Sequence, residues 1–187
     1  LSTAGVLGGT LIIEGEDYGE GASVALERTH AMAMKSSMWL LDPRPNLPTI
    51  VKMVEKGFEL SEASSSPVIM ELRIRACHLQ GSFVARDNRA PAISTRRFLA
   101  GAAEFNYERL SHPPATFRQE KLKADVRMRA ARKFVLENRL NEVFEGSESG
   151  VGIICPGGLY NNLLRALQML GLADNFGHAR LPILVLN

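Results

Sequence analysis

The chain has few of the features that would assign it to a specialised class of protein. Its 187 residues contain only two cysteines, Cys77 and Cys155, which excludes a disulfide framework and a cysteine-ligated zinc or iron–sulfur site within this stretch. No run approaches the roughly 20 apolar residues that span a bilayer. The first residues also lack the basic start of a signal peptide. We therefore predict a cytoplasmic protein with no membrane segment, and we expect both cysteines to be buried or nearly so.

Charge of one sign is scarce as well. The formal net charge is +2 and the sequence pI is near 8.7, which is too small an excess for binding nucleic acid or an anionic membrane through bulk charge. Residues 86–145 hold 13 Lys or Arg and 8 Asp or Glu, a local excess of +5, and the rest of the chain sums to −3. Because acidic residues interrupt the basic ones there, we expect no nucleic acid as a partner.

Strand-like and helical patterns alternate in the first 85 residues. Residues 10–13 are a short β-branched strand, and a helix runs from Asn46, its N-cap, to about Ser64. Residues 68–75 alternate apolar and polar side chains, as in a strand with one core face and one polar face. Strands separated by helices predict βαβ units and a mainly parallel sheet flanked by helices, so the fold class is α/β.

The sequence changes character twice, and we divide it into residues 1–85, 86–145 and 146–187. The middle part predicts a basic linker whose second half, residues 116–144, is one long amphipathic helix. The last part returns to strand, helix and strand and predicts the start of a second α/β domain. The apolar face of the long helix is formed by Phe117, Leu122, Val126, Val135, Leu140 and Phe144.

Polar residues stand where a parallel sheet gathers ligands, outside the carboxyl ends of its strands. A loop after residue 13 carries Glu14, Glu16, Asp17 and Glu20, which suits a cation or a polar substrate, or else is a solvated turn. Arg75 and His78 end the strand over residues 68–75, where they can hold an anionic group or pair with neighbouring carboxylates.

Two further features have a functional and a structural interpretation. His30, on a helix predicted from residue 22, can take part in a site or pair with nearby polar groups. The turn Cys155-Pro156-Gly157-Gly158 resembles a phosphate-binding turn only in its glycines, and we interpret it as a tight turn needed for packing.

Five blocks follow one another through the first 80 residues: Gly8-Gly9-Thr10-Leu11-Ile12-Ile13-Glu14-Gly15-Glu16-Asp17-Tyr18-Gly19, Leu41-Asp42-Pro43, Met53-Val54-Glu55-Lys56-Gly57-Phe58-Glu59-Leu60-Ser61-Glu62, Ser66-Pro67-Val68 and Arg75-Ala76-Cys77-His78. Together they resemble the thiamine diphosphate-dependent 2-oxoacid:ferredoxin oxidoreductases, and most closely the alpha subunits of the indolepyruvate ferredoxin oxidoreductases. Residues 150–187 resemble the family's next domain, which is like the C-terminal domain of transketolases.

This resemblance implies a fold and a reaction. Residues 1–85 would be the later half of a pyrimidine-binding thiamine diphosphate domain, and residues 146–187 would start a transketolase C-terminal-like domain. The intact enzyme would oxidatively decarboxylate indolepyruvate or another 2-oxoacid to an acyl-CoA and pass electrons through iron–sulfur clusters to ferredoxin. Its implied cofactors are thiamine diphosphate and Mg²⁺. Its implied partners are the remaining domains or subunits, ferredoxin and CoA, in a homo- or hetero-oligomer.

The resemblance also implies that this chain is catalytically silent alone. The family's essential glutamate corresponds to a position upstream of residue 1, and the diphosphate-binding and cysteine-rich segments have no counterpart here. We therefore assign no catalytic and no metal-binding residue. Glu16, Asp17, Tyr18 and Gly19 match an acidic loop near the family's active site, although many relatives carry proline where Tyr18 stands. Arg75 and His78 match its Arg-x-x-His strand end, and we predict that all six residues lie near the active site.

A function of another class is also consistent with the sequence. The chain can be a non-catalytic Rossmann-like interaction module that docks through the amphipathic helix over residues 116–144. The apolar face of such a helix must be covered by another surface.

Overall fold

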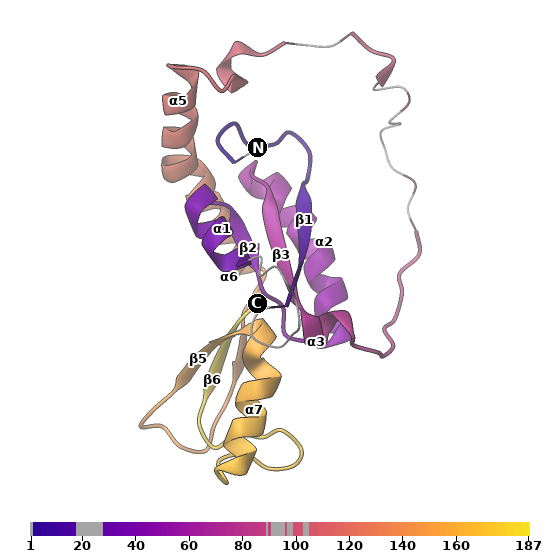
Figure 1. Cartoon of the computed structure of the whole chain (residues 1–187), viewed down its shortest axis with the longest axis vertical. Coiled ribbons are helices and arrows are strands. Elements are labelled where there is room, and N and C mark those ends of the chain that lie inside the picture. Colours follow the sequence, from indigo (N-terminus) through magenta and orange to yellow (C-terminus); the bar gives the residue numbers. More distant parts are fainter. Residues whose placement is uncertain (1, 18–27, 89, 91–95, 97–98, 103–104) are drawn as a thin grey trace.

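The computed structural model describes residues 2–17, 28–88, 90, 96, 99–102 and 105–187. Figure 1 shows two α/β lobes, one above the other. The first lobe is built on residues 2–17, 28–78 and 115–140, and the second lobe on residues 141–187. None of the helices in these described ranges is long and apolar enough to cross a membrane.

The first lobe is organised around a sheet of three parallel strands. Strands β1 (Leu11–Glu16) and β2 (Trp39–Leu41) lie on either side of β3 (Val68–Arg73). Both neighbours run parallel to β3, so the predicted α/β class and mainly parallel sheet are confirmed. Among the described residues, β1 and β2 each pair with β3 alone, which leaves one hydrogen-bonding edge of each strand unpaired.

Helices cover the two faces of this sheet. Met70 of β3 packs with Met53 and Leu60 of α2 (Leu47–Ser64), so α2 covers one face. Because neighbouring side chains on a strand point to opposite faces, Glu71 points to the other face, where it meets α1 (Thr29–Ser36). The carboxyl ends of the strands therefore lie next to the beginning of α1.

The sequence predicts the start of α2 correctly. The Asn46 side chain accepts a hydrogen bond from the backbone N–H of Thr49 at 3.2 Å, and Pro48 stands in the first turn. Such a cap satisfies one of the N–H groups that lack a partner inside the helix.

The prediction for residues 68–75 is correct in position but wrong in two respects. The strand ends at Arg73, and Ile74–Cys77 form the short helix α3, so Cys77 is exposed rather than buried. The strand also has no solvated face, because Glu71 is as buried as the apolar residues before it. A central strand between two layers of helix is buried on both faces, whatever its sequence alternation suggests.

The long helix is present but shorter than predicted. It consists of α5 (Ala115–Leu122), a π-helical segment η2 (Lys123–Arg127) and α6 (Met128–Glu137). The helix therefore ends at Glu137, and the residues expected to complete it form a strand instead, β4 (Glu142–Phe144).

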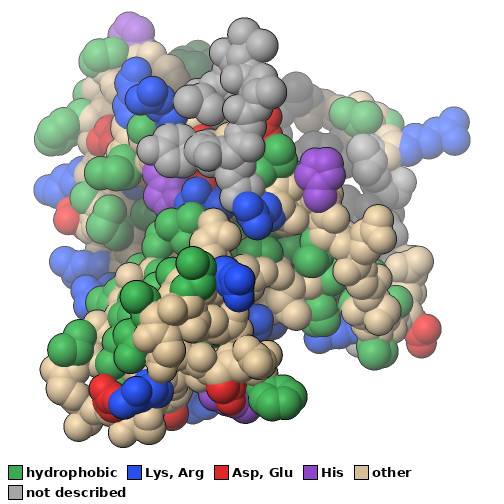
Figure 2. Space-filling view, turned by 60° about the horizontal axis from the view of Figure 1, so that its bottom comes forward, with side chains coloured by type: hydrophobic (Ala, Val, Ile, Leu, Met, Phe, Trp, Pro, Cys, Tyr) green, Lys and Arg blue, Asp and Glu red, His purple; other side chains and the backbone are tan. Residues whose placement is uncertain are grey.

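The predicted apolar face is only partly buried: Val135 packs against the core and Leu140 lies in it, but the earlier residues of that face are exposed. Phe117 and Val126 are 73% and 55% exposed, and Figure 2 shows hydrophobic side chains exposed among charged ones on its left side, where Figure 1 places α5. The buried positions are spaced by four residues: Ala115, Gln119, Lys123, Arg127 and Ala131. In a regular helix of 3.6 residues per turn, residues spaced by four do not stay on one face, because each one is rotated slightly around the helix axis from the one before. The π-helical turn at η2 reduces this rotation, because it contains more residues per turn.

The polar side chains in this row can be buried because they form hydrogen bonds with backbone carbonyl oxygens. Arg127 donates a hydrogen bond to the Thr3 carbonyl at 2.9 Å and is also bonded to the Gln119 side chain. The Lys123 ammonium group lies 3.4 Å from the carbonyl oxygen of Ser36. These contacts fasten the helix to the first residues of the chain and to the end of α1.

The second lobe is a mixed sheet covered by one helix. Strands β5 (Ile153–Pro156) and β6 (Ile183–Leu186) are parallel and are joined by η3 (Gly157–Leu159) and α7 (Tyr160–Met169). Strand β4 pairs with β6 in the antiparallel direction, so the order is β4-β6-β5. The core of this lobe includes Cys155, which is buried as predicted.

Candidate functional site

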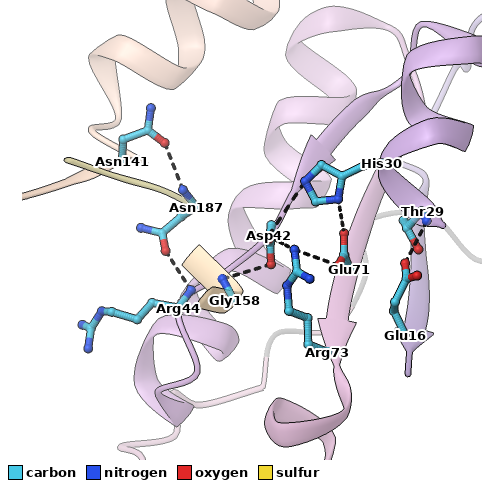
Figure 3. Close-up of polar contacts among 10 residues, drawn as sticks. All are labelled: Glu16, Thr29, His30, Asp42, Arg44, Glu71, Arg73, Asn141, Gly158 and Asn187. Atoms are coloured by element: carbon cyan, nitrogen blue, oxygen red, sulfur yellow. Dashed lines mark hydrogen bonds and ion pairs between the residues drawn. The ribbon is translucent and has the colours of Figure 1, made fainter. Parts of the chain in front are cut away.

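A cluster of charged side chains gathers at the carboxyl edge of the first sheet. Strand β3 contributes Glu71 and Arg73, Asp42 follows β2, and His30 comes from the first turn of α1. Figure 3 shows the His30 ring facing both Asp42 and Glu71, and Arg73 reaching the same two carboxylates. We call these four residues the charged cluster.

Glu16, at the end of β1, caps α1 beside this cluster. Its two carboxylate oxygens accept hydrogen bonds from the backbone N–H groups of Arg28 and Thr29, each at 2.8 Å. Burial by itself raises the pKa of Glu16, but its contacts with Thr29 and Arg28 and the charge of Arg73 outweigh that effect and lower the pKa. Glu16 is therefore an ionised carboxylate that stabilises the positive end of the helix.

Glu71 is the most deeply buried member of the cluster, with 1% of its surface exposed. Its Oε2 atom lies 2.7 Å from Nδ1 of His30, and its Oε1 atom lies 3.2 Å from Nη2 of Arg73. Burial and the neighbouring charge of Asp42 raise the pKa of Glu71, although Arg73 and His30 act in the opposite direction. The folded protein therefore favours the protonated form of this carboxyl group more than water does.

Asp42 connects the cluster to the second lobe. Its Oδ2 atom accepts a hydrogen bond from Arg73 at 3.0 Å, and its Oδ1 atom accepts one from the backbone N–H of Gly158 at 3.1 Å. A Cβ atom on Gly158 would collide with Arg73 and Asp42, and one on Gly157 would collide with the Asp42 carbonyl. The interpretation of residues 155–158 as a tight packing turn is thus confirmed.

Arg44 makes the second connection between the lobes. Its guanidinium group donates to both oxygens of Glu142, at 3.0 and 2.9 Å, and lies 5.5 and 5.4 Å from the ring centres of Phe144 and Tyr160. Its backbone N–H donates to the Asn187 side chain at 2.8 Å. The lobes therefore meet through charge-assisted contacts directly beside the charged cluster.

A cavity of about 330 Å³ opens onto the cluster. It lies between the first turn of α1 and the carboxyl ends of β1 and β3. A small ligand or a hydrated ion fits such a volume. The residues that line it are Glu16, Arg28, Thr29, His30, Ala31, Glu71 and Arg73.

The six residues predicted to lie near an active site do not all lie in the same place. Glu16 lines the cavity, and Asp17 follows it at the end of β1 and is half-buried. Tyr18 and Gly19 lie outside the described residues. Arg75 and His78 are exposed at α3, beyond the strand, and neither lines this cavity.

Sequence reasoning missed three members of the cluster. No motif in the sequence singles out Asp42, Glu71 or Arg73, and the sequence leaves His30 with two interpretations. The signal for Glu71 was available, since a carboxylate inside the apolar run of β3 must be buried and needs a partner. His30 could not be paired with it in advance, because the two residues are far apart in the sequence.

The chain is similar to proteins of one kind over almost its whole length. It is 30% identical over 173 residues to the indolepyruvate oxidoreductase subunit IorA of Methanothermobacter marburgensis, a match that covers 92% of this chain and 27% of that protein. This chain is a relative of IorA. The IorA of Methanothermobacter thermautotrophicus is 30% identical over 176 residues, with 92% and 27% covered, and that of Pyrococcus abyssi is 29% identical over 176 residues, with 94% and 26% covered.

The resemblance to the indolepyruvate oxidoreductases is therefore confirmed, and the relatives of this chain are oxidoreductase subunits. The chain spans about a quarter of the length of the curated relatives it matches. No protein-family model and no solved structure matches it.

Proposed function

We propose that this chain is part of a thiamine diphosphate-dependent oxidoreductase that decarboxylates indolepyruvate or another 2-oxoacid to an acyl-CoA and passes electrons to ferredoxin. The observation that carries the proposal is the similarity of about 92% of the chain to IorA, whose name states an indolepyruvate oxidoreductase. The parallel sheet supports it, because ligands bind outside the carboxyl ends of such strands.

In this proposal the chain supplies one side of the active site. Glu16 is not the residue that contacts the thiamine ring, because both of its oxygens are taken by N–H groups of Arg28 and Thr29. The described residues therefore fit a wall of a shared site, whose essential glutamate, Mg²⁺ and iron–sulfur clusters belong to other parts of the enzyme. Thiamine diphosphate, when bound, supplies the stabilised carbanion of the decarboxylation.

The chain's own residues would bind and orient the substrate. Arg75 is an exposed cation just beyond the carboxyl end of β3, where it can attract the carboxylate of a 2-oxoacid. His78 lies one turn later, and Glu16 borders the cavity beside the charged cluster. We accordingly propose Glu16, Asp17, Tyr18, Gly19, Arg75 and His78 as residues near the active site.

The test is an assay of the whole oxidoreductase that contains this chain. With thiamine diphosphate, Mg²⁺, CoA and indolepyruvate, we expect reduction of ferredoxin. We expect Arg75→Ala to raise KM for the 2-oxoacid at least about tenfold, the loss of one charge-assisted contact. Arg180→Ala, which removes an exposed arginine paired with Glu148 in the second lobe, should leave KM unchanged.

The isolated chain provides the complementary measurement. Calorimetric titration with thiamine diphosphate should show no binding, since the chain supplies only one side of the site. Turnover of a 2-oxoacid by the isolated chain, or an intact enzyme that ignores all 2-oxoacids, would contradict the proposal.

A second candidate function is docking of another protein on the long helix. It is favoured by the exposure of apolar side chains there, because Phe117, Leu122, Val126, Met128 and Leu136 are each between 44% and 73% exposed. Replacing Phe117 with Asp should then abolish association of this chain with the rest of the enzyme in size-exclusion chromatography. Association that survives the substitution would leave the helix without this role.

A further inference from the structure

Three side chains of the charged cluster carry metal-ligating atoms that lie close together, with Nδ1 of His30 facing Glu71 and Nε2 facing Asp42. One nitrogen of His30, one oxygen of Asp42 and one oxygen of Glu71 all lie within 4.8 Å of one another. Asp42 and Glu71 are 3% and 1% exposed, whereas the His30 ring is half-exposed and faces the cavity. An imidazole nitrogen with two carboxylates is a common donor set for divalent transition metals.

The charges around this point do not balance. Asp42 and Glu71 are both buried, and Arg73 is the arginine that contacts them. With both carboxylates ionised and His30 neutral as a ligand, the sum of these charges is −1. Charges taken out of water must be paired or must coordinate a metal. A bound cation would pair the remaining negative charge.

Unpartnered polar atoms face the same place. Neither oxygen of Glu71 accepts a well-formed hydrogen bond from any described residue, although both lie in ion-pair contact with His30 or Arg73. Thr29 lines the cavity beside Glu71. A metal ion with coordinated water would satisfy the oxygens of Glu71, because the cavity has room for water ligands.

We propose that His30, Asp42 and Glu71 bind a divalent transition-metal ion such as Zn²⁺ at the carboxyl edge of the first sheet. The ion takes one nitrogen and two carboxylate oxygens from the chain and completes its coordination with water from the cavity. Arg73 contacts Oδ2 of Asp42 at 3.0 Å and Oε1 of Glu71 at 3.2 Å, so the ion takes Oε2 of Glu71 and shares the Asp42 carboxylate with Arg73. The imidazole ligand favours Zn²⁺ over Mg²⁺, which prefers oxygen ligands.

The experiment is a titration of the purified full chain with Zn²⁺ after treatment with EDTA, followed by calorimetry at neutral pH. We expect about one equivalent to bind. His30→Gln should weaken binding at least about tenfold, the smallest loss expected even for residues that only support metal ligands. Glu71→Gln should weaken it as well, and circular dichroism should show that both variants remain folded. The titration contains no thiamine diphosphate or 2-oxoacid, so its result is independent of the proposed function.

The matched control is His178→Gln. His178 also contacts a carboxylate, since its Nδ1 lies 3.0 Å from Oδ2 of Asp174, but this pair is exposed and no second carboxylate is grouped with it among the described residues. Binding should therefore be unchanged in this variant. The proposal is overturned if Zn²⁺ does not bind to the unaltered chain, if folded His30→Gln and Glu71→Gln bind it as well as before, or if His178→Gln loses it equally.

Discussion

Replacing Arg44 with Ala tests how the two lobes are held together. In the structure Arg44 belongs to the segment after β2, whereas its partners Glu142, Phe144 and Tyr160 all belong to the second lobe. The substitution removes two charge-assisted hydrogen bonds, two cation–π contacts and a longer hydrogen bond to the Thr49 hydroxyl at once. It leaves the backbone contact to Asn187 in place.

The expected loss follows from the geometry. The side chains of Arg44 and Glu142 are 20% and 30% exposed, so solvent screens the pair only partly. A hydrogen bond between charged groups contributes about 1.5–3 kcal/mol, and a cation–π contact contributes about 0.5–1 kcal/mol at an exposed site. We expect Arg44→Ala to lower the free energy of unfolding by about 2–4 kcal/mol, since the contributions are not additive.

The assay is urea unfolding of four proteins: the unaltered chain, Arg44→Ala, Glu142→Ala and the double variant. The cycle should give a coupling of about 1–2 kcal/mol at neutral pH. The pKa of Glu142 is lowered, because the hydrogen bonds from Arg44 and Asn187 outweigh its burial. The pair therefore stabilises the protein above the usual pKa of a glutamate, and this stabilisation is lost as the pH falls through the lowered value.

The control is the exposed pair of Arg180 and Glu148, whose side chains are 57% and 44% exposed. Removing it should cost less than about 0.5 kcal/mol. A coupling between Arg44 and Glu142 that is no larger than that of the control pair, or that does not decrease at acidic pH, would refute the reasoning.

Three further predictions concern single positions. Gly158→Ala should destabilise the chain by at least about 2 kcal/mol in urea unfolding, because its Cβ meets the Asp42 carboxylate, whereas Gly150→Ala, with open space around it, should change little; equal effects would contradict this account. Glu71→Gln should gain stability relative to the unaltered chain as the pH rises from 4 to 7, because its raised pKa makes ionisation oppose folding in that range; thermal unfolding across pH measures this, and a constant difference would be the contrary result. Asn46→Ala should cost about 1 kcal/mol and increase hydrogen exchange in the first turn of α2, since the cap is lost; exchange that stays unchanged would count against it.

The parts of the fold that local sequence dictates could be predicted. The cap at Asn46, the apolar strand β3 and the parallel arrangement follow from short-range patterns. Which face of a helix or strand is buried could not be predicted in the same way, because burial depends on neighbours that are distant in the sequence. The long helix shows this, since Lys123 and Arg127 bury themselves against carbonyls of residues more than 80 positions away.

The candidate site was predictable in location but not in membership. The sequence predicts Glu16 beyond a strand at the carboxyl edge of the sheet, and the structure has it at the end of β1, where it lines the cavity. Glu71 and His30 meet only because α1 returns across the sheet, and no spacing in the sequence encodes that contact. Arg75 and His78 moved away from the cavity because the chain turns into α3 after Arg73.

The two outer strands of the first sheet have a consequence for handling this protein. Each of β1 and β2 offers a row of backbone donors and acceptors that no other described strand takes, and Ile13 on β1 is 55% exposed. Unpaired edge strands of this kind can form hydrogen bonds with extended segments of neighbouring molecules. At high concentration the chain should therefore self-associate through strand addition, and a lysine in place of Ile13 should keep it monomeric.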